Sequence, residues 1–212
     1  MYFFKNPDII KRIYPNKVWE KKSSEKKIFL TFDDGPTEQI TPWILEQLRN
    51  FDIKATFFCL GKNIEKQPDL FKQLITEGHQ IGNHTFNHEN GWETNNYTYY
   101  KSILQTEKFT KNLLFRPPFG GLTMHKQKAL VRYGFQVIMW DVMPGDFDKK
   151  LSKEECLKAA IDHTSKGSII VFHDNIKAEK NMKYAFPRFV EHFLELGYEF
   201  ETIKTLEVNY GF

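Results

Sequence analysis

Short apolar runs alternate along the chain with longer segments in which apolar residues recur at helical spacing. The first clear run, residues 28–32, is Ile-Phe-Leu-Thr-Phe, a composition that favours a buried β-strand. It stops at Asp33 and Asp34, and Gly35 and Pro36 then break the strand. Two adjacent carboxylates resist joint ionisation unless a cation or a hydrogen-bond donor lies nearby. The pattern therefore indicates either a cation-binding position or a plain Asx-type turn.

The same alternation continues to the end of the chain. Further strands are predicted at residues 55–60, 80–82, 113–115, 135–140, 168–172 and 198–201. Helices are predicted between these strands. The first has Pro42 near its start, the second is capped by Asn63 and ends at Gly78, and two more cover residues 97–111 and 123–133. A fifth helix starts at a capping box of Ser152 and Glu155 and ends at Gly167, and a sixth ends at Gly197. Alternating buried strands and helices predict a parallel sheet with helices outside it.

About seven strand–helix units of this kind fit an α/β fold of one type, a closed or nearly closed (β/α)7-type barrel with its site at the carboxyl ends of the strands. An open doubly wound sheet is the alternative, but the chain has no Gly-rich phosphate loop that would support a nucleotide site there. At 212 residues the chain is expected to form a single domain. Residues 1–27 would form an N-terminal strap packed on the barrel, and residues 28–212 would form the barrel domain itself.

Composition narrows the classes of function. The net charge of +3 is too small to imply nucleic acid as a partner, and the lysines are scattered among acids. Cys59 and Cys156 are predicted to be buried free thiols, which fits a reducing compartment. No apolar run is long enough to span a membrane. The apolar patch at residues 1–4 falls short of the roughly 7–15 apolar residues of a signal peptide, so a cytoplasmic location is expected, with export left open.

Residues able to carry out chemistry gather where the predicted strands end. Asp33 and Asp34 follow the first strand, His84 and His88 the third, Arg116 the fourth, Asp141 and Asp146 the fifth, and His173 and Asp174 the sixth. The carboxyl ends of parallel barrel strands share one face, and that face carries the active site in barrel enzymes. Residues far apart in the sequence are therefore expected to converge in space.

Two imidazoles and one carboxylate form a ligand set for Zn²⁺ or a similar divalent ion with a position left open for water. His84 and His88 stand four residues apart, which allows both rings to lie on one side of a helical turn or tight loop. One carboxylate of the Asp33 and Asp34 pair would then bind the metal, and the other would remain free as a base. The alternative for the two histidines is ordinary structural hydrogen bonding.

Five segments carry a resemblance. Residues 31–36 (TFDDGP), 84–88 (HTFNH), 116–120 (RPPFG), 146–147 (DF) and 171–174 (VFHD) resemble, in order, the five motifs of the polysaccharide deacetylase family, the chitooligosaccharide deacetylase homology domain. The resemblance runs from about residue 28 to about residue 206. It implies a distorted (β/α) barrel, the metal-dependent removal of N- or, less favoured, O-acetyl groups from a saccharide, and a catalytic role for residues 28–212.

The resemblance also implies roles for individual residues. Asp34, His84 and His88 would bind the metal, with zinc favoured over cobalt, nickel or manganese. Asp33 would be the general base, oriented by Arg116, and His173 would be the general acid, tuned by Asp146. The backbone N–H of Phe119 would help to hold an oxyanion, and the remaining substrate contacts would come from Pro118, Trp140, Phe147 and Val171. The expected partner is an N-acetylated saccharide whose identity, like the oligomeric state, the sequence leaves open.

Several alternatives accompany these assignments. The alternative for Arg116 is an ion pair at the protein surface. The alternative for Trp140, Phe147 and Val171 is packing in the hydrophobic core without substrate contact. Met143 and Phe147 stand where the family often has Asp and Trp, which leaves substrate selectivity and the tuning of His173 open. Two other functions compete with sugar deacetylation: hydrolysis of a non-sugar amide on the same scaffold, and carbohydrate binding without catalysis.

Overall fold

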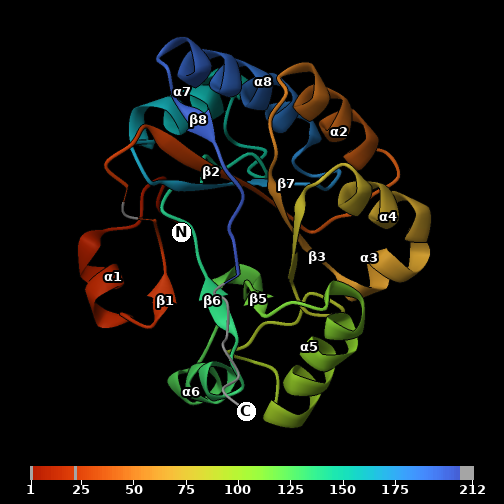
Figure 1. Cartoon of the computed structure of the whole chain (residues 1–212). Coiled ribbons are helices and arrows are strands. Elements are labelled where there is room, and N and C mark those ends of the chain that lie inside the picture. The colour runs from red at the N-terminus through yellow and green to blue at the C-terminus, as the bar shows by residue number, and fades with distance from the viewer. Residues whose placement is uncertain (1, 22, 206–212) are drawn as a thin grey trace.

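The computed structural model describes residues 2–21 and 23–205. Within these residues, eight parallel strands form one sheet with the order β1-β6-β5-β4-β3-β2-β7, and β8 pairs with β2 (Figure 1). The strands are β1 Lys17–Val18, β2 Lys27–Asp33, β3 Thr56–Cys59, β4 Gln80–Asn83, β5 Leu114–Phe115, β6 Gln136–Ile138, β7 Ile169–His173 and β8 Glu199–Phe200. The predicted parallel sheet is confirmed, and β1 is an additional strand.

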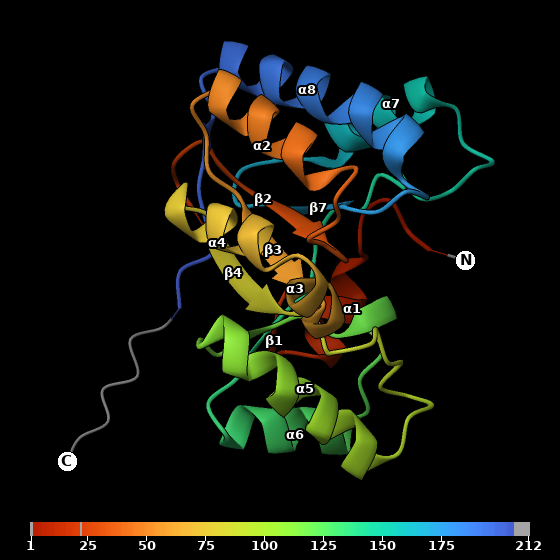
Figure 2. The ribbon, with the colours of Figure 1, turned by 90° about the vertical axis from the view of Figure 1, so that its right-hand side faces the viewer.

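Helices cover the outside of the sheet (Figures 1 and 2). They are α1 Asp8–Ile13, α2 Thr41–Asn50, α3 Gly61–Lys66, α4 Pro68–Thr76, α5 Asn96–Thr110, α6 Met124–Arg132, α7 Lys153–His163 and α8 Glu179–Glu195, with a short 3-10 turn η1 at Pro118–Gly120. Figure 2 shows α2, α7 and α8 together on one side of the molecule and α5 and α6 on the other. The predicted capping box of Ser152 and Glu155 is present at the start of α7.

An irregular segment closes the gap between the edge strands. After β6, the backbone N–H of Asp141 donates to the Ile169 carbonyl of β7 at 2.9 Å, and the Val171 N–H donates to the Val142 carbonyl at 3.0 Å. On its other side, the Met139 N–H donates to the Val18 carbonyl of β1 at 2.7 Å. The sheet therefore curls into a distorted barrel, and an open doubly wound sheet is wrong.

Strand β2 pairs with β3, β7 and β8 and is buried almost throughout. The ring of Phe32 stacks on Phe57 of β3, with ring centroids 5.1 Å apart, and meets Phe186 of α8 edge-on at 5.2 Å. A strand covered on both faces needs the continuous apolar run seen in the sequence. This packing fixes the position of the carboxyl end of β2, where Asp33 and Asp34 lie.

The N-terminal segment is more than an outer strap. It contains α1, and it adds β1 to the sheet beside β6, with Lys17 opposite Val137. The single helix predicted after Asn63 is wrong, because Pro68 lacks the N–H that would continue α3 and instead starts α4. Asn63 lies inside α3 and donates from its side chain to the Asp34 carbonyl at 2.7 Å.

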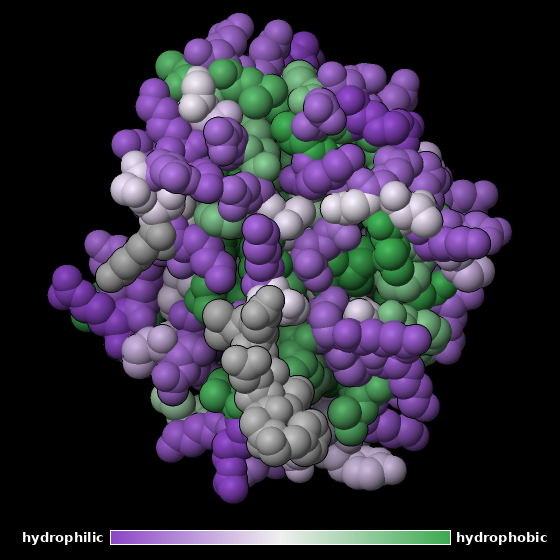
Figure 3. Space-filling view, viewed as in Figure 1, coloured by the Kyte–Doolittle hydropathy of each residue, from purple (hydrophilic) through white to green (hydrophobic). Residues whose placement is uncertain are grey.

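One face of the molecule is largely hydrophilic, and both cysteines are buried. Figure 3 shows a face on which hydrophilic side chains predominate, with hydrophobic ones between them. Among residues 2–21 and 23–205, no helix combines the length and apolar character that crossing a bilayer requires. Cys59 and Cys156 are both buried and free, as predicted.

Candidate active site

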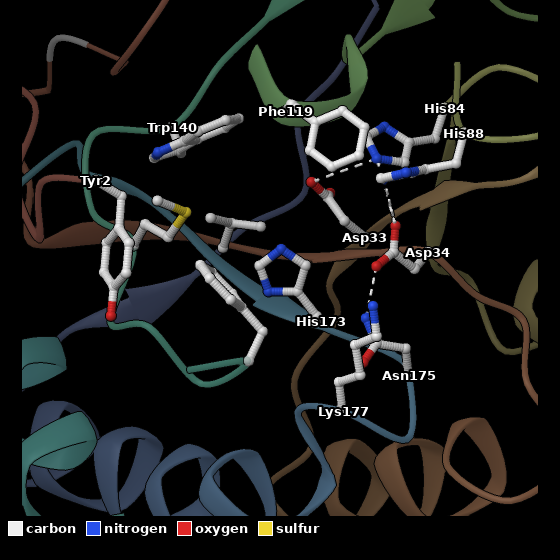
Figure 4. Close-up of a pocket in the computed structure, with 13 residues that line it drawn as sticks. Tyr2, Asp33, Asp34, His84, His88, Phe119, Trp140, His173, Asn175 and Lys177 are labelled. Carbon is white, nitrogen blue, oxygen red and sulfur yellow. Dashed lines mark hydrogen bonds and ion pairs between the residues drawn. The ribbon is translucent and has the colours of Figure 1, made fainter. Parts of the chain in front are cut away.

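The predicted convergence of polar residues at one rim of the barrel is confirmed. A pocket of about 330 Å³ opens at the carboxyl ends of the strands (Figure 4). The polar residues predicted from the motifs line it: Asp33, Asp34, His84, His88 and His173. Its apolar wall consists of Phe119, Trp140, Met143, Phe147 and Val171. Tyr2, Asn175 and Lys177 complete the lining. Polar groups are thus concentrated at one part of a largely apolar cavity, as in many ligand sites.

Three of these residues have the geometry of a metal site. One oxygen of Asp34, Oδ1, lies 3.1 Å from His88 Nε2 and 3.5 Å from His84 Nε2. One ligand atom from each residue lies within 4.8 Å of the others. Asp34 Oδ1 is also buried without a hydrogen-bond partner among the described residues, which is costly unless a cation fills the space. The donor set therefore fits a divalent metal ion.

The backbone turns sharply where it delivers these ligands. Asp34 has φ 81°, Thr85 has φ 64° and His88 has φ 68°, all in the left-handed region that side chains other than glycine rarely adopt. Strained backbone of this kind is concentrated at functional sites, where the surrounding structure holds it in place. His84 and His88 therefore come from a tight loop after β4 rather than from a helix.

Neighbouring groups orient the ligands. His84 Nδ1 lies 2.7 Å from the Arg116 carbonyl, and since a carbonyl only accepts, Nδ1 carries the proton and Nε2 is free to bind a metal. Burial lowers the pKa of His84 to about 4, with the charge of Asp33 opposing the shift, so the ring is neutral. Burial raises the pKa of Asp34, but the surrounding imidazoles, His88 first, bring it well below its ordinary value.

Asp33 and Arg116 form a buried ion pair. Arg116 Nη1 donates to Asp33 Oδ1 and to Thr31 Oγ1, both at 2.7 Å, and Nη2 donates to the Met139 carbonyl at 2.9 Å. The guanidinium carbon also lies 4.1 Å from the centre of the Phe58 ring. Arg116 is completely buried, so the alternative of a surface ion-pair partner is wrong.

His173 and Asp146 form a second pair. Asp146 accepts two hydrogen bonds from His173, one from its backbone N–H at 2.7 Å and one from Nδ1 at 2.8 Å. The other ring nitrogen, Nε2, is therefore available to a group in the pocket. Burial opposes the charged imidazole, but the charge and hydrogen bond of Asp146 outweigh it and raise the pKa of His173 to about 9. His173 is therefore protonated at neutral pH.

The predicted pocket wall is present except at one position. Trp140, Phe147 and Val171 line the cavity, although Val171 is also fully buried. Pro118 is buried at the start of η1 and is not among the residues that line the pocket, so its substrate contact stays a prediction. Phe119 has φ 59°, and its ring meets His88 edge-on at 4.5 Å.

Sequence reasoning missed three residues of the pocket. Asn175 donates from Nδ2 to Asp34 Oδ2 at 2.6 Å, and Tyr2 and Lys177 line the cavity without any motif around them. Asn175 follows the last motif by one residue, which was the available signal. Asp174, which follows the last strand of the motif set, is buried and accepts a hydrogen bond from Thr37 Oγ1 at 2.9 Å, and burial raises its pKa to about 7.

A metal-ligand trio flanked by a carboxylate and a protonated imidazole, at the mouth of a parallel barrel, defines the class of metal-dependent hydrolases. The model of the family described as polysaccharide deacetylase matches residues 20–138. The peptidoglycan-N-acetylglucosamine deacetylase of Bacillus cereus is 32% identical over 195 residues, covering 89% of this chain and 91% of that protein. This chain belongs to the polysaccharide deacetylase family, whose members remove acetyl groups from sugars with the help of a metal ion.

Two further comparisons agree. The solved structure of the Bc1960 peptidoglycan N-acetylglucosamine deacetylase, in complex with a naphthyl N-hydroxybenzamide, superposes with a TM-score of 0.85 and 29% identity, covering 92% of this chain and 94% of that one. The peptidoglycan-N-acetylglucosamine deacetylase PgdA of Listeria monocytogenes is 33% identical over 192 residues, which are 88% of this chain. The chain spans only 40% of the length of that relative.

Proposed function

We propose that this chain hydrolyses the N-acetyl group of N-acetylglucosamine residues in a glycan, with zinc at Asp34, His84 and His88. The observation that carries the proposal is the gathering of a metal-ligand trio, the Asp33 carboxylate and the His173 imidazole in one pocket. The substrate class is supported by the printed activities of the relatives in Bacillus cereus and Listeria monocytogenes.

The metal requirement follows from the chemistry of amides, which are poor electrophiles. A bound divalent ion supplies Lewis-acid polarisation of the acetyl carbonyl and lowers the pKa of water. Two imidazoles and one carboxylate accept several divalent metals, and zinc suits this set with an open position for water. The chain's own contribution is to orient two of the three ligand residues, His84 through the Arg116 carbonyl and Asp34 through the Asn175 amide.

Asp33 takes the proton of the attacking water. It lies beside the metal ligands, with Oδ2 4.0 Å from His84 Nε2, and its other oxygen is held by Arg116. A guanidinium stays charged at any accessible pH, so Arg116 gives this carboxylate a permanent cationic partner and fixes its orientation. General base catalysis by a positioned group typically contributes about 10²–10⁴-fold.

His173 protonates the departing amine nitrogen, because an amine leaves poorly as an anion. Its Nε2 faces the pocket, and Asp146 keeps the ring charged. The backbone N–H of Phe119 donates no hydrogen bond within the described residues and is free to bind the developing oxyanion. One such donor contributes roughly 3 kcal/mol to the stability of the transition state.

The test is the release of acetate from N-acetylchitooligosaccharides and from peptidoglycan by zinc-loaded protein. We expect turnover that a chelator abolishes and that added Zn²⁺ restores. Turnover of a non-sugar amide but of no N-acetylated saccharide would favour the alternative hydrolase. Saccharide binding without acetate release would favour a non-catalytic carbohydrate-binding protein. The presence of Asp33, paired with Arg116, and of His173 in one pocket supports catalysis instead.

A further inference from the structure

The cavity extends away from the metal-ligand trio and ends at an aromatic ring from the N-terminal segment. Figure 4 shows Tyr2 on the opposite side of the pocket from His84 and His88, with Trp140 and the apolar side chains of the wall between them. In this arrangement the polar end of the pocket takes the carbonyl to be cleaved. The acyl carbons of a substrate would therefore point toward Tyr2.

The Tyr2 ring is held in a fixed position. Its hydroxyl donates to Asp148 Oδ2 at 3.0 Å, and its ring centroid lies 5.2 Å from that of Phe147. The loop is also shaped around it: a Cβ added to Gly145, which has φ +78°, would lie 2.4 Å from the Tyr2 hydroxyl oxygen. Only glycine fits there, so the loop and the tyrosine are mutually fitted.

Backbone hydrogen bonds anchor the segment that carries Tyr2. The Met143 N–H donates to the Phe4 carbonyl, and the Asn6 N–H donates to the Asp141 carbonyl, both at 2.9 Å. The Asn6 side chain also donates to the Trp140 carbonyl at 2.7 Å. The segment is therefore tied to the same stretch of chain that supplies two wall residues of the pocket.

We propose that Tyr2 closes the acyl end of the pocket and limits the length of the acyl group that the enzyme accepts, as a specificity-determining residue. This inference rests on the proposed deacetylation. An acyl chain that extends to this end of the cavity would have to displace the Tyr2 ring. The ring is held by a hydrogen bond and by packing against Phe147, and its displacement would lose both.

The test compares chitooligosaccharides that carry N-acetyl, N-propionyl or N-butyryl groups. Wild-type protein should prefer N-acetyl, and Tyr2→Ala should raise the ratio of kcat/KM for N-butyryl over N-acetyl by at least about 10-fold, the discrimination that a single methylene gives in an apolar pocket. Tyr2→Phe keeps the ring and should keep the wild-type ratio. Tyr14→Ala, which changes the same segment outside the pocket, should also leave the ratio unchanged.

An unchanged ratio in Tyr2→Ala would overturn the proposal. If that variant fails to fold, Tyr2→Leu decides, since it also shortens the wall. Calorimetric binding of acetohydroxamic and butyrohydroxamic acid to the zinc-loaded protein gives a readout without turnover. Wild type should favour the shorter acid and Tyr2→Ala should lose that preference. Absence of turnover on every acyl substrate would refute the deacetylase function, while the hydroxamate preference would still decide the role of Tyr2.

Discussion

Two buried charge pairs flank the same pocket, and they present opposite partners to it. In one pair the cation is hidden: Arg116 has no exposed side-chain surface, and its partner Asp33 reaches the pocket. In the other the anion is hidden: the Asp146 side chain is also unexposed, while 16% of the His173 side chain is exposed.

The difference shows how one site holds a base and an acid at the same pH. The buried Arg116 guanidinium pairs with Asp33, and the buried Asp146 carboxylate raises the pKa of His173. Oppositely charged surroundings for two titratable groups are typical of acid–base catalysis. Each pair can be broken separately, and the consequences should differ.

The largest effect is expected from Asp33→Asn, which removes the base but keeps an oxygen that can accept from Arg116. We expect kcat to fall by about 10²–10⁴-fold, the usual contribution of general base catalysis. Acetate release measures the loss, and zinc titration of the variant should show metal binding retained. A loss of kcat below about threefold would exclude Asp33 as the base.

The next effect is on stability. Arg116→Met leaves the buried Asp33 carboxylate without its cation, which should lower the free energy of unfolding by about 3–5 kcal/mol. Urea denaturation measures it. The double variant Arg116→Met with Asp33→Asn should regain much of the loss, because the unpaired charge is then gone. A double variant no more stable than the single one would show that packing against Phe58 matters more than the charge pair.

A smaller effect, on zinc affinity, is expected from Asn175, which donates a hydrogen bond to the metal ligand Asp34. Asn175→Ala removes the hydrogen bond to Asp34 Oδ2 and should weaken zinc affinity by about 10–100-fold. Competition with a chromophoric chelator measures the affinity. Lys177→Ala is the matched control, because Lys177 lines the pocket but makes no hydrogen bond to a ligand within the described residues. Equal affinities in the two variants would contradict the assignment.

The smallest effect at neutral pH is expected from Asp146→Asn. The pKa of His173, about 9 with Asp146 present, should fall toward its ordinary value of 6.5, although Asp33 and Asp34 still favour the charged ring. The acid form is lost as pH rises through this pKa, so the basic limb of the kcat/KM profile should move to lower pH. A basic limb at the wild-type position would contradict the role of Asp146.

The same shift has a consequence for stability. Because the folded protein holds the His173 proton more tightly than the unfolded chain, the gain is fully present below pH 6.5 and is lost as pH rises through about 9. Asp146→Asn should therefore remove stability at neutral pH and much less above pH 9. Urea denaturation of both proteins across this range measures it.

The positions of the polar motifs were predictable because a parallel barrel brings all strand ends to one rim. Asp34 and His84, separated by fifty residues in the chain, meet for this reason. The boundary at Pro68 was also readable, since proline ends a helix and starts the next one.

Contacts made only in three dimensions were not predictable. Tyr2 carries no motif, and only the pairing of its segment with residues 141–143 brings it to the pocket. Pro118 lies within a motif, but the turn at η1 buries it. The cytoplasmic location stays a prediction.

The most direct test of the account is anomalous scattering at the zinc edge from crystals of the protein grown with Zn²⁺. We predict one ion bound by Asp34 Oδ1 and the Nε2 atoms of His84 and His88, at about 2.0–2.2 Å from each. An ion bound elsewhere, or imidazoles turned away from Asp34 with no ion between them, would contradict it.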